Sequence, residues 1–191
     1  DNDSQAPTPS NQIELNYIGS FDPSGASTST CEIVVHDPTS QRLFTTSAVA
    51  GYLDIIDFSN PTNPSVISSV NINPYGGVTS VAVKNGIVAV ASPNADETLN
   101  GSIVFFNNNG TFLNQVTVGA LPDMITFSPD GTKVMTANEG QPNTDYSIDP
   151  EGSVSIIDIS GGIASLSQSN VTTLLFTAYN AQEATLIASG V

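Results

Sequence analysis

A recurring pattern of short apolar strands is the feature that most constrains the fold of this chain. A strand, a tight turn and a second strand occur in three copies: 32–47, 80–92 and 123–138. Each copy has residues that favour a sharp turn between its two strands: Asp37-Pro38, Asn85-Gly86 and Asp130-Gly131. This repetition of order and of turn chemistry indicates one structural unit used three times.

Each copy continues with a third and a fourth strand. The third strands are expected at 51–59, 101–107 and 152–160, and their leading glycines stand 50 and then 51 residues apart. The fourth strands are expected at 66–72, 112–118 and 171–177, after stretches that contain Asn, Pro or Gly. Four antiparallel strands recurring at this period predict the blades of a β-propeller. A β-sandwich with irregular turns is the alternative, because it also has many short strands.

The predicted fold class is therefore all-β, with about three blades in an incomplete ring. The blades are expected at 30–73, 78–119 and 121–177, with an extra strand at 13–20 that completes the last blade of a ring. Residues 1–12 are polar and are expected to be flexible. Residues 178–191 are expected to form a short helix, ended by Gly190, or the start of a further blade. Because propellers usually need four to eight blades, other blades or other chains are expected to complete the ring.

The charge of the chain narrows its possible partners. Asp and Glu number 18 against three Lys and Arg, which gives a formal net charge of −15. This charge disfavours binding to nucleic acid and to anionic lipid, and it favours either cations or solubility alone. No apolar run is long enough to cross a bilayer, so membrane insertion is not expected.

Few cysteines and lysines are typical of an extracellular protein. Cys31 is the only cysteine, which excludes an internal disulfide, and it is expected to be a small buried strand residue. Asn, Ser and Thr are abundant, and Lys is scarce. We therefore expect a secreted or cell-surface protein.

Two long loops contain most of the candidate metal ligands. In a propeller, the loop between the second and third strands emerges on the face where the innermost strand begins. Loops 92–100 and 138–151 are therefore expected to share a face with the starts of the innermost strands. Calcium prefers carboxylate and amide oxygens. The predicted calcium ligands are Glu32, Asp123, Glu139, Asp145, Asp149 and Glu151, and loop 92–100 adds Asn94, Asp96 and Glu97.

Simpler roles remain open for these acidic residues. The loops can be solvated polar segments with no bound ion. Glu32 and Asp123 can accept hydrogen bonds from backbone amides of neighbouring blades.

No catalytic residue is predicted. His36 is the only histidine, and it lies beside a turn on the opposite face from the acidic loops. The sequence has no G-x-S-x-G element. Its three basic residues form no evident cradle for a phosphate group.

Several segments are similar to a known protein family. The segments are 119–143, 149–158, 80–86 and 176–184. They resemble the choice-of-anchor I family of secreted bacterial propellers, and the resemblance extends over 13–191. It implies an extracellular or surface-attached propeller of about seven blades, in chains much longer than this one. Members are often labelled alkaline-phosphatase-like.

The leading hypothesis is a non-catalytic extracellular or cell-surface module. It would bind calcium and serve interaction with surface proteins or glycans, or assembly with other blades or copies of itself. One alternative is the N-terminal part of a metal-dependent extracellular phosphohydrolase. Another is a self-assembling filament subunit, in which the next chain finishes the ring.

Overall fold

Three four-stranded antiparallel sheets make up most of this computed structural model, which describes residues 11–23 and 31–190. The first blade contains β1 (Cys31–Asp37), β2 (Arg42–Ser47), β3 (Tyr52–Asp57) and β4 (Ser65–Asn71). The second contains β5 (Ser80–Lys84), β6 (Ile87–Ser92), β7 (Asn100–Asn107) and β8 (Phe112–Ala120). The third contains β9 (Pro122–Phe127), β10 (Lys133–Asn138), β11 (Ser153–Asp158) and β12 (Val171–Leu175). The all-β prediction with three four-stranded units is confirmed.

The helical elements are short. They are η1 (Asn73–Tyr75), η2 (Ile163–Ser165), η3 (Gln168–Asn170), η4 (Thr177–Gln182) and α1 (Glu183–Ala188). The helix expected at 178–188 is thus an α-helix only over its second half. None of the helices in the described part of the chain has the length and apolar character that crossing a lipid bilayer requires.

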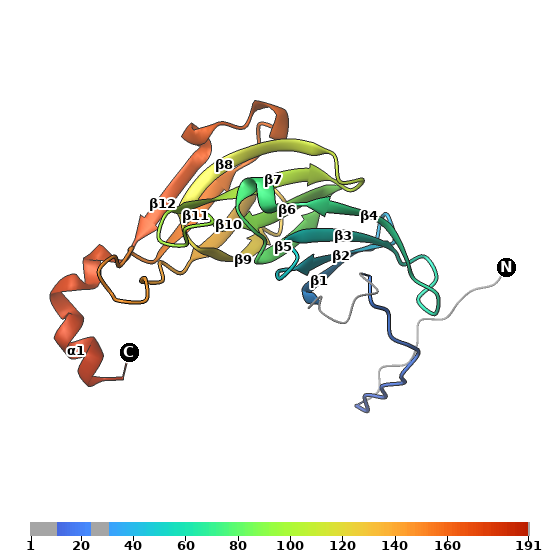
Figure 1. The fold of residues 1–191 in the computed structure, drawn as a ribbon, viewed down its shortest axis with the longest axis horizontal. Coiled ribbons are helices and arrows are strands. Elements are labelled where there is room, and N and C mark those ends of the chain that lie inside the picture. Colours follow the sequence, from blue (N-terminus) through green and yellow to red (C-terminus); the bar gives the residue numbers. More distant parts are fainter. Residues whose placement is uncertain (1–10, 24–30, 191) are drawn as a thin grey trace.

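The blades follow one another along an arc (Figure 1). Strands β1, β5 and β9 lie at the inner edge of this arc, where β5 contacts both β1 and β9. Within each blade the strands pair in chain order, so every blade is a simple meander. Over the described residues, the three blades do not close into a ring.

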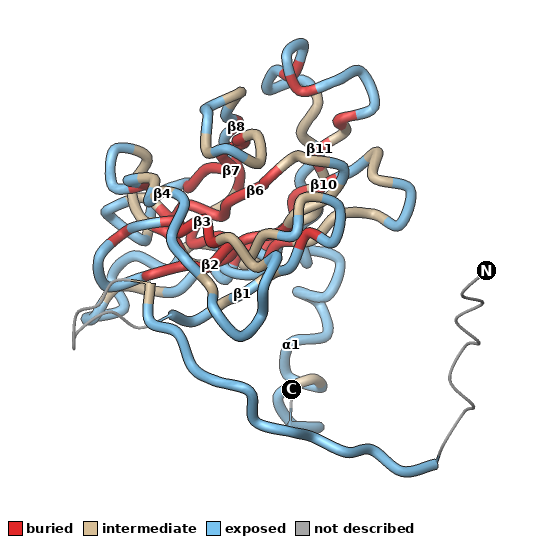
Figure 2. Tube along the Cα trace, turned by 90° about the vertical axis from the view of Figure 1, so that its right-hand side faces the viewer, coloured by how far each residue is buried: buried red, intermediate tan, exposed pale blue. Residues whose placement is uncertain are grey.

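Two apolar cores hold the blades together, one at each junction. We call the side of a blade that is turned toward the next blade its front face, and the opposite side its back face. The core between the first and second blades includes Phe44, Leu53 and Phe106, and the core between the second and third includes Phe105 and Ile157. The buried residues accordingly lie inside the stack of blades, and exposed loops surround it (Figure 2).

Alternation along the strands explains why the second blade serves both cores. On β7, Val104 and Phe106 contribute to the core with the first blade, whereas Ile103 and Phe105 contribute to the core with the third. Successive side chains of a strand point to opposite faces of the sheet. A strand that is apolar at every position is therefore buried on both sides.

The hairpin turns agree only in part with the expected residues. Asn85 and Gly86 have positive φ values of 52° and 76°, as a type I′ turn requires. In the first blade the positive φ, 52°, falls on Gln41 and not on the Asp37-Pro38 pair. Asp37 instead accepts hydrogen bonds from the Thr39 N–H and the Ser40 hydroxyl.

Two further expectations are wrong. No strand forms within residues 11–23, although Ile13, Leu15 and Tyr17 alternate as in a strand. A strand needs a partner for its backbone N–H and C=O groups, and Ile13 and Leu15 are instead about nine-tenths exposed. Cys31 lies at the first position of β1, where it is exposed and not buried. Residues 1–10 of the segment expected to be flexible lie outside the described residues.

Candidate functional site

A cleft with polar side chains in its lining lies between two long loops of the described chain. Loop 93–99 joins β6 to β7 in the second blade, and loop 139–152 joins β10 to β11 in the third. Residues 95–98 of the first loop and residues 141–144 and 146 of the second line the same cleft, whose volume is about 790 Å³. This arrangement agrees with the expectation that the two loops share a face.

Asp96 organises the loop of the second blade. Its Oδ1 accepts hydrogen bonds from the Thr98 N–H at 3.1 Å and from the Thr98 hydroxyl at 2.7 Å. Two residues earlier in the turn, Asn94 Oδ1 accepts from the Asp96 N–H at 3.0 Å. These are the local turns that Asn and Asp side chains favour. They leave Asp96 and Glu97 exposed at the wall of the cleft.

The loop of the third blade is closed at its neck by Gly140. This residue has a φ of 63°, and a Cβ atom there would lie 2.6 Å from the Gly152 nitrogen and from the Pro150 oxygen. Only glycine allows this conformation together with so close an approach of backbone. The neck therefore brings both ends of the loop together over the end of the sheet.

Asn143 pins the outer part of the same loop. Its backbone N–H donates to the Ile148 oxygen at 3.0 Å, and its Oδ1 accepts from the Ile148 N–H at 3.1 Å. Its Nδ2 donates to the Ser147 hydroxyl at 3.0 Å. Tyr146, at the tip, has a positive φ of 58° and is 77% exposed. The loop thus presents a solvent-exposed aromatic ring at the cleft.

Electrostatics make the cleft acidic. Asp96 and Glu97 contribute carboxylates, Gln141 and Asn143 contribute amides, and no lysine or arginine lines it. Next to the cleft, the Ser147 hydroxyl and then the Ser147 N–H donate to Asp145 and hold the pKa of this carboxyl below its ordinary value. The cleft accordingly suits cations and hydroxyl groups better than anions.

The six predicted calcium ligands are all exposed, and none of them lines the cleft. Glu32 lies on β1 and Asp123 on β9, at the inner edge of the arc. Glu139, Asp145 and Asp149 belong to loop 139–152 but do not line the cleft. Glu151 lines a different pocket, together with residues of β8 and β12.

No group of three or more His, Cys, Asp or Glu side chains is placed to hold a metal ion within residues 11–23 and 31–190. Calcium binding by the six residues therefore stays a prediction. The sequence-based argument did note Asp96 and Glu97 as oxygen donors, but it missed Gln141 and Tyr146. The only signal for these two residues in the sequence is their position in a long polar loop.

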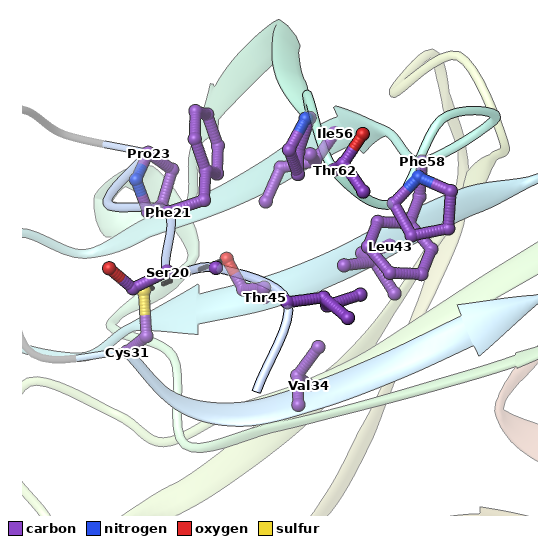
Figure 3. A pocket seen from close by; sticks show the side chains of 14 residues that line it. Ser20, Phe21, Pro23, Cys31, Val34, Leu43, Thr45, Ile56, Phe58 and Thr62 are labelled. Carbon is purple, nitrogen blue, oxygen red and sulfur yellow. Dashed lines mark hydrogen bonds between the residues drawn. The ribbon is translucent and has the colours of Figure 1, made fainter. Parts of the chain in front are cut away.

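An apolar pocket covers the back face of the first blade. Residues 18–21 and 23 pass over this face and line the pocket together with Val34, Leu43, Ile56 and Phe58 (Figure 3). Its volume is about 330 Å³. Cys31 stands at its edge, with its sulfur 3.9 Å from the Thr45 hydroxyl oxygen. The N-terminal segment therefore takes part of the place that a neighbouring blade would occupy.

Comparison with known protein families gives a match that covers all three blades. The pattern of the choice-of-anchor I domain matches residues 32–191, which is most of the chain. The chain belongs to the choice-of-anchor I domain family. The resemblance that the sequence suggested is thus confirmed. Membership of the choice-of-anchor I family supports an extracellular setting, either secreted or anchored at a surface.

Solved structures show the same fold at low sequence identity. The choice-of-anchor I chain is similar to hydrazine synthase from Kuenenia stuttgartiensis, with a TM-score of 0.56 and 14% identity over 75% of this chain and 41% of that one. It is similar to a protein from Lactobacillus plantarum, with a TM-score of 0.53 and 14% identity over 73% of this chain and 41% of that one.

A functionally unknown protein from Desulfotomaculum acetoxidans is also similar, with a TM-score of 0.50 and 15% identity over 74% of this chain and 45% of that one. The chain thus spans less than half the length of these three structures. Identity this low shows the propeller-like fold and not the chemistry. No curated protein matches the sequence.

Proposed function

We propose that this chain is an extracellular interaction module that binds a neutral glycan through the cleft between loops 93–99 and 139–152. The observation that carries the proposal is the lining of this cleft, which combines two carboxylates with two amides beside an exposed tyrosine. Sugar hydroxyls both donate and accept hydrogen bonds, so they pair with carboxylate oxygens and with amide groups alike. A tyrosine ring adds a flat apolar surface with a polar tip.

The net negative charge of the chain favours neutral glycans over acidic ones. A formal charge of −15 repels sulfated and other acidic polysaccharides. The carboxylates of Asp96 and Glu97 add to this repulsion at the cleft itself. A neutral polysaccharide is therefore the expected partner, and binding should depend only weakly on salt.

Calcium is the ion that we propose for the same cleft. Calcium takes six to eight oxygen ligands, and water commonly completes the set. Asp96 and Glu97, with the amide oxygens of Gln141 and Asn143, supply hard oxygen donors from two loops. A bound ion would reduce the repulsion between the two neighbouring carboxylates. It would also link the second blade to the third.

Binding of calcium is testable by thermal unfolding of the 191-residue chain. A ligand of the native state must raise the melting temperature, so calcium should raise it and a chelator should reverse the shift. The double variant Asp96→Asn, Glu97→Gln should bind calcium about tenfold or more weakly. Glu183→Gln, which removes an exposed carboxylate outside the cleft, is the matched control. An equal loss in Glu183→Gln, or no shift with calcium at all, would contradict this ion site.

Binding of glycans is testable separately with immobilised dextran and mannan. Tyr146→Ala should reduce retention, while Tyr179→Ala, which removes another exposed ring that does not line the cleft, should not. Retention of sulfated dextran in place of the neutral polymers would contradict the electrostatic argument. Equal retention of both tyrosine variants would place the glycan elsewhere.

A further inference from the structure

A second, smaller pocket lies on the back face of the first blade. Ser47, Ala50, Tyr52, Asp54 and Ser69 line it, and its volume is about 220 Å³. Pairing of the strands explains why these side chains meet, because Tyr52 stands opposite Ser47 and Asp54 stands opposite Ser69. This pocket shares no lining residue with the cleft between the two loops.

Asp54 is buried in this pocket, and its side chain has only one hydrogen bond to the described residues. Its side chain belongs to a residue that is 4% exposed. The Ser69 hydroxyl donates to its Oδ1, and among the described residues no group donates to its Oδ2. The single ion pair of the described chain joins Lys133 to Asp158, so Asp54 has no cationic partner there. Buried carboxylates in proteins are normally paired or fully hydrogen-bonded, because an unpaired buried charge is costly.

Ser47 adds a second unsatisfied group to the same pocket. The residue is 2% exposed, and its hydroxyl has no hydrogen-bond partner in the described part of the chain. Buried polar side chains without a partner are rare in native structures, and each needs an explanation. Among the described residues, the Asp54 Oδ2 and the Ser47 hydroxyl thus line one pocket without a hydrogen-bond donor.

The third blade carries an amide at the corresponding position. Asn138 stands opposite Ser153 at the end of β10, just as Ser47 stands opposite Tyr52 at the end of β2. Asn138 Nδ2 donates to the hydroxyls of Ser153 and Ser155, at 3.0 Å in each case. Ser155 lies two residues beyond Ser153 and thus corresponds to Asp54, which lies two residues beyond Tyr52.

Comparison of the two blades indicates that the first blade lacks a nitrogen donor at this position. In the third blade an internal amide nitrogen fills the site and supplies the donors. In the first blade the shorter Ser47 leaves the space open, and a carboxylate replaces the serine hydroxyl. The first blade therefore needs an external nitrogen donor, and its negative charge favours a cation.

We propose that this pocket binds a primary ammonium group. An ammonium group has three N–H donors, and the pocket offers three acceptors in Asp54 Oδ2, Ser47 Oγ and Ser69 Oγ. A single carboxylate with hydroxyls does not suit calcium, which takes six to eight oxygen ligands. The ammonium group comes either from a free amine or from a lysine side chain of a partner protein. In both cases the same charged N–H donors would bind the pocket.

Titration calorimetry of the full chain with propylammonium chloride tests this proposal. The unmodified chain should bind propylammonium and should not bind tetramethylammonium, which has the charge but no N–H donor. Asp54→Asn should weaken binding by at least about tenfold, because it removes a charged buried acceptor. Asp57→Asn, three residues along the same strand but outside the pocket, should leave binding unchanged.

Ser47→Asn is the second variant, and it keeps the test decisive if Asp54→Asn does not fold. It places in the first blade the amide that the third blade carries. It should raise the melting temperature and abolish propylammonium binding. Equal binding of propylammonium by the unmodified chain and by Ser47→Asn would overturn the proposal. Equal binding of tetramethylammonium, or binding of calcium that depends on Asp54, would also overturn it.

A third titration distinguishes the two sources of the ammonium group. Tighter binding of Nα-acetyl-lysine-methylamide than of propylammonium would assign the pocket to a lysine of a protein partner. Tighter binding of propylammonium would assign it to a free amine. Each of these results supports the ammonium site. The absence of heat with both ligands would overturn it and would leave the glycan cleft untouched.

Discussion

Acidic and amide side chains end the third strands of the blades. Asp57, Asn107 and Asp158 occupy corresponding positions, and each accepts a hydrogen bond at 2.9 Å from the N–H two residues further on. The pKa values of Asp57 and Asp158 lie below their ordinary value, and the largest cause is the hydrogen bond from the hydroxyl of Ser59 or Ser160. Part of the large negative charge therefore has a structural role in turns, independent of any ligand.

Asp130 gives the clearest expectation for acid stability. The Ser128 hydroxyl, followed by the N–H and the hydroxyl of Thr132, lowers its pKa from 3.8 to about 2. Because the pKa is lower in the folded chain, the charged form stabilises the fold above pH 3.8, and this contribution is lost as the pH falls through about 2.

Urea unfolding at several pH values measures this contribution. Asp130→Asn should destabilise the chain at pH 6, and the difference from the unmodified chain should shrink toward pH 1.5. A difference that stays constant over this range would show that the Asp130 charge does not stabilise the turn.

At the scale of elements, the long loop of the third blade depends on its neck. Gly140 has both a positive φ and backbone atoms too close for a Cβ, whereas Gly162, with a φ of 88°, has open space around it. Gly162→Ala should therefore cost only the strain of the backbone, about 1–2 kcal/mol. Gly140→Ala should cost more, because backbone must also move.

Thermal unfolding and calcium titration of these two variants test the role of the neck. Gly140→Ala should also weaken ligand binding at the cleft, since residues 141–144 and 146 line it. Gly162→Ala should leave binding unchanged. Equal effects of the two variants on stability would contradict the close contacts at the neck.

At the scale of the whole molecule, the second blade joins the two cores. Phe105 and Phe106 are adjacent in the sequence, yet they belong to different cores, one on each face of the sheet. Each is at most 1% exposed. The second blade therefore cannot unfold without loss of both cores, which predicts a single cooperative transition for the three blades.

Phe105→Ala and Phe106→Ala test this coupling. Each should lower the free energy of unfolding by about 3–5 kcal/mol, as large truncations in a packed core do. Both should leave one transition when urea unfolding is followed by fluorescence and by circular dichroism. Phe176→Ala, at a residue that is 56% exposed, is the control with little effect. Two separate transitions in either core variant would contradict a shared second blade.

Local signals were sufficient for the architecture. Turn residues, the spaced glycines and strand alternation act over a few residues, so they predicted the number of sheets, the order of their strands and the common face of the two long loops. The strand expected at 13–20 failed because its alternation is also local, while a strand depends on a partner that the pattern does not contain.

The two sites depend on contacts between residues far apart in the sequence. Asp96 and Glu97 face Gln141 only because adjacent blades pack side by side and Gly140 closes the second loop. Asp54 interrupts an apolar strand in the sequence, and nothing local shows that Ser47 and Ser69 lie beside it. Strand register and blade stacking decide which polar groups become neighbours and which stay unpaired, and both are properties of the folded chain.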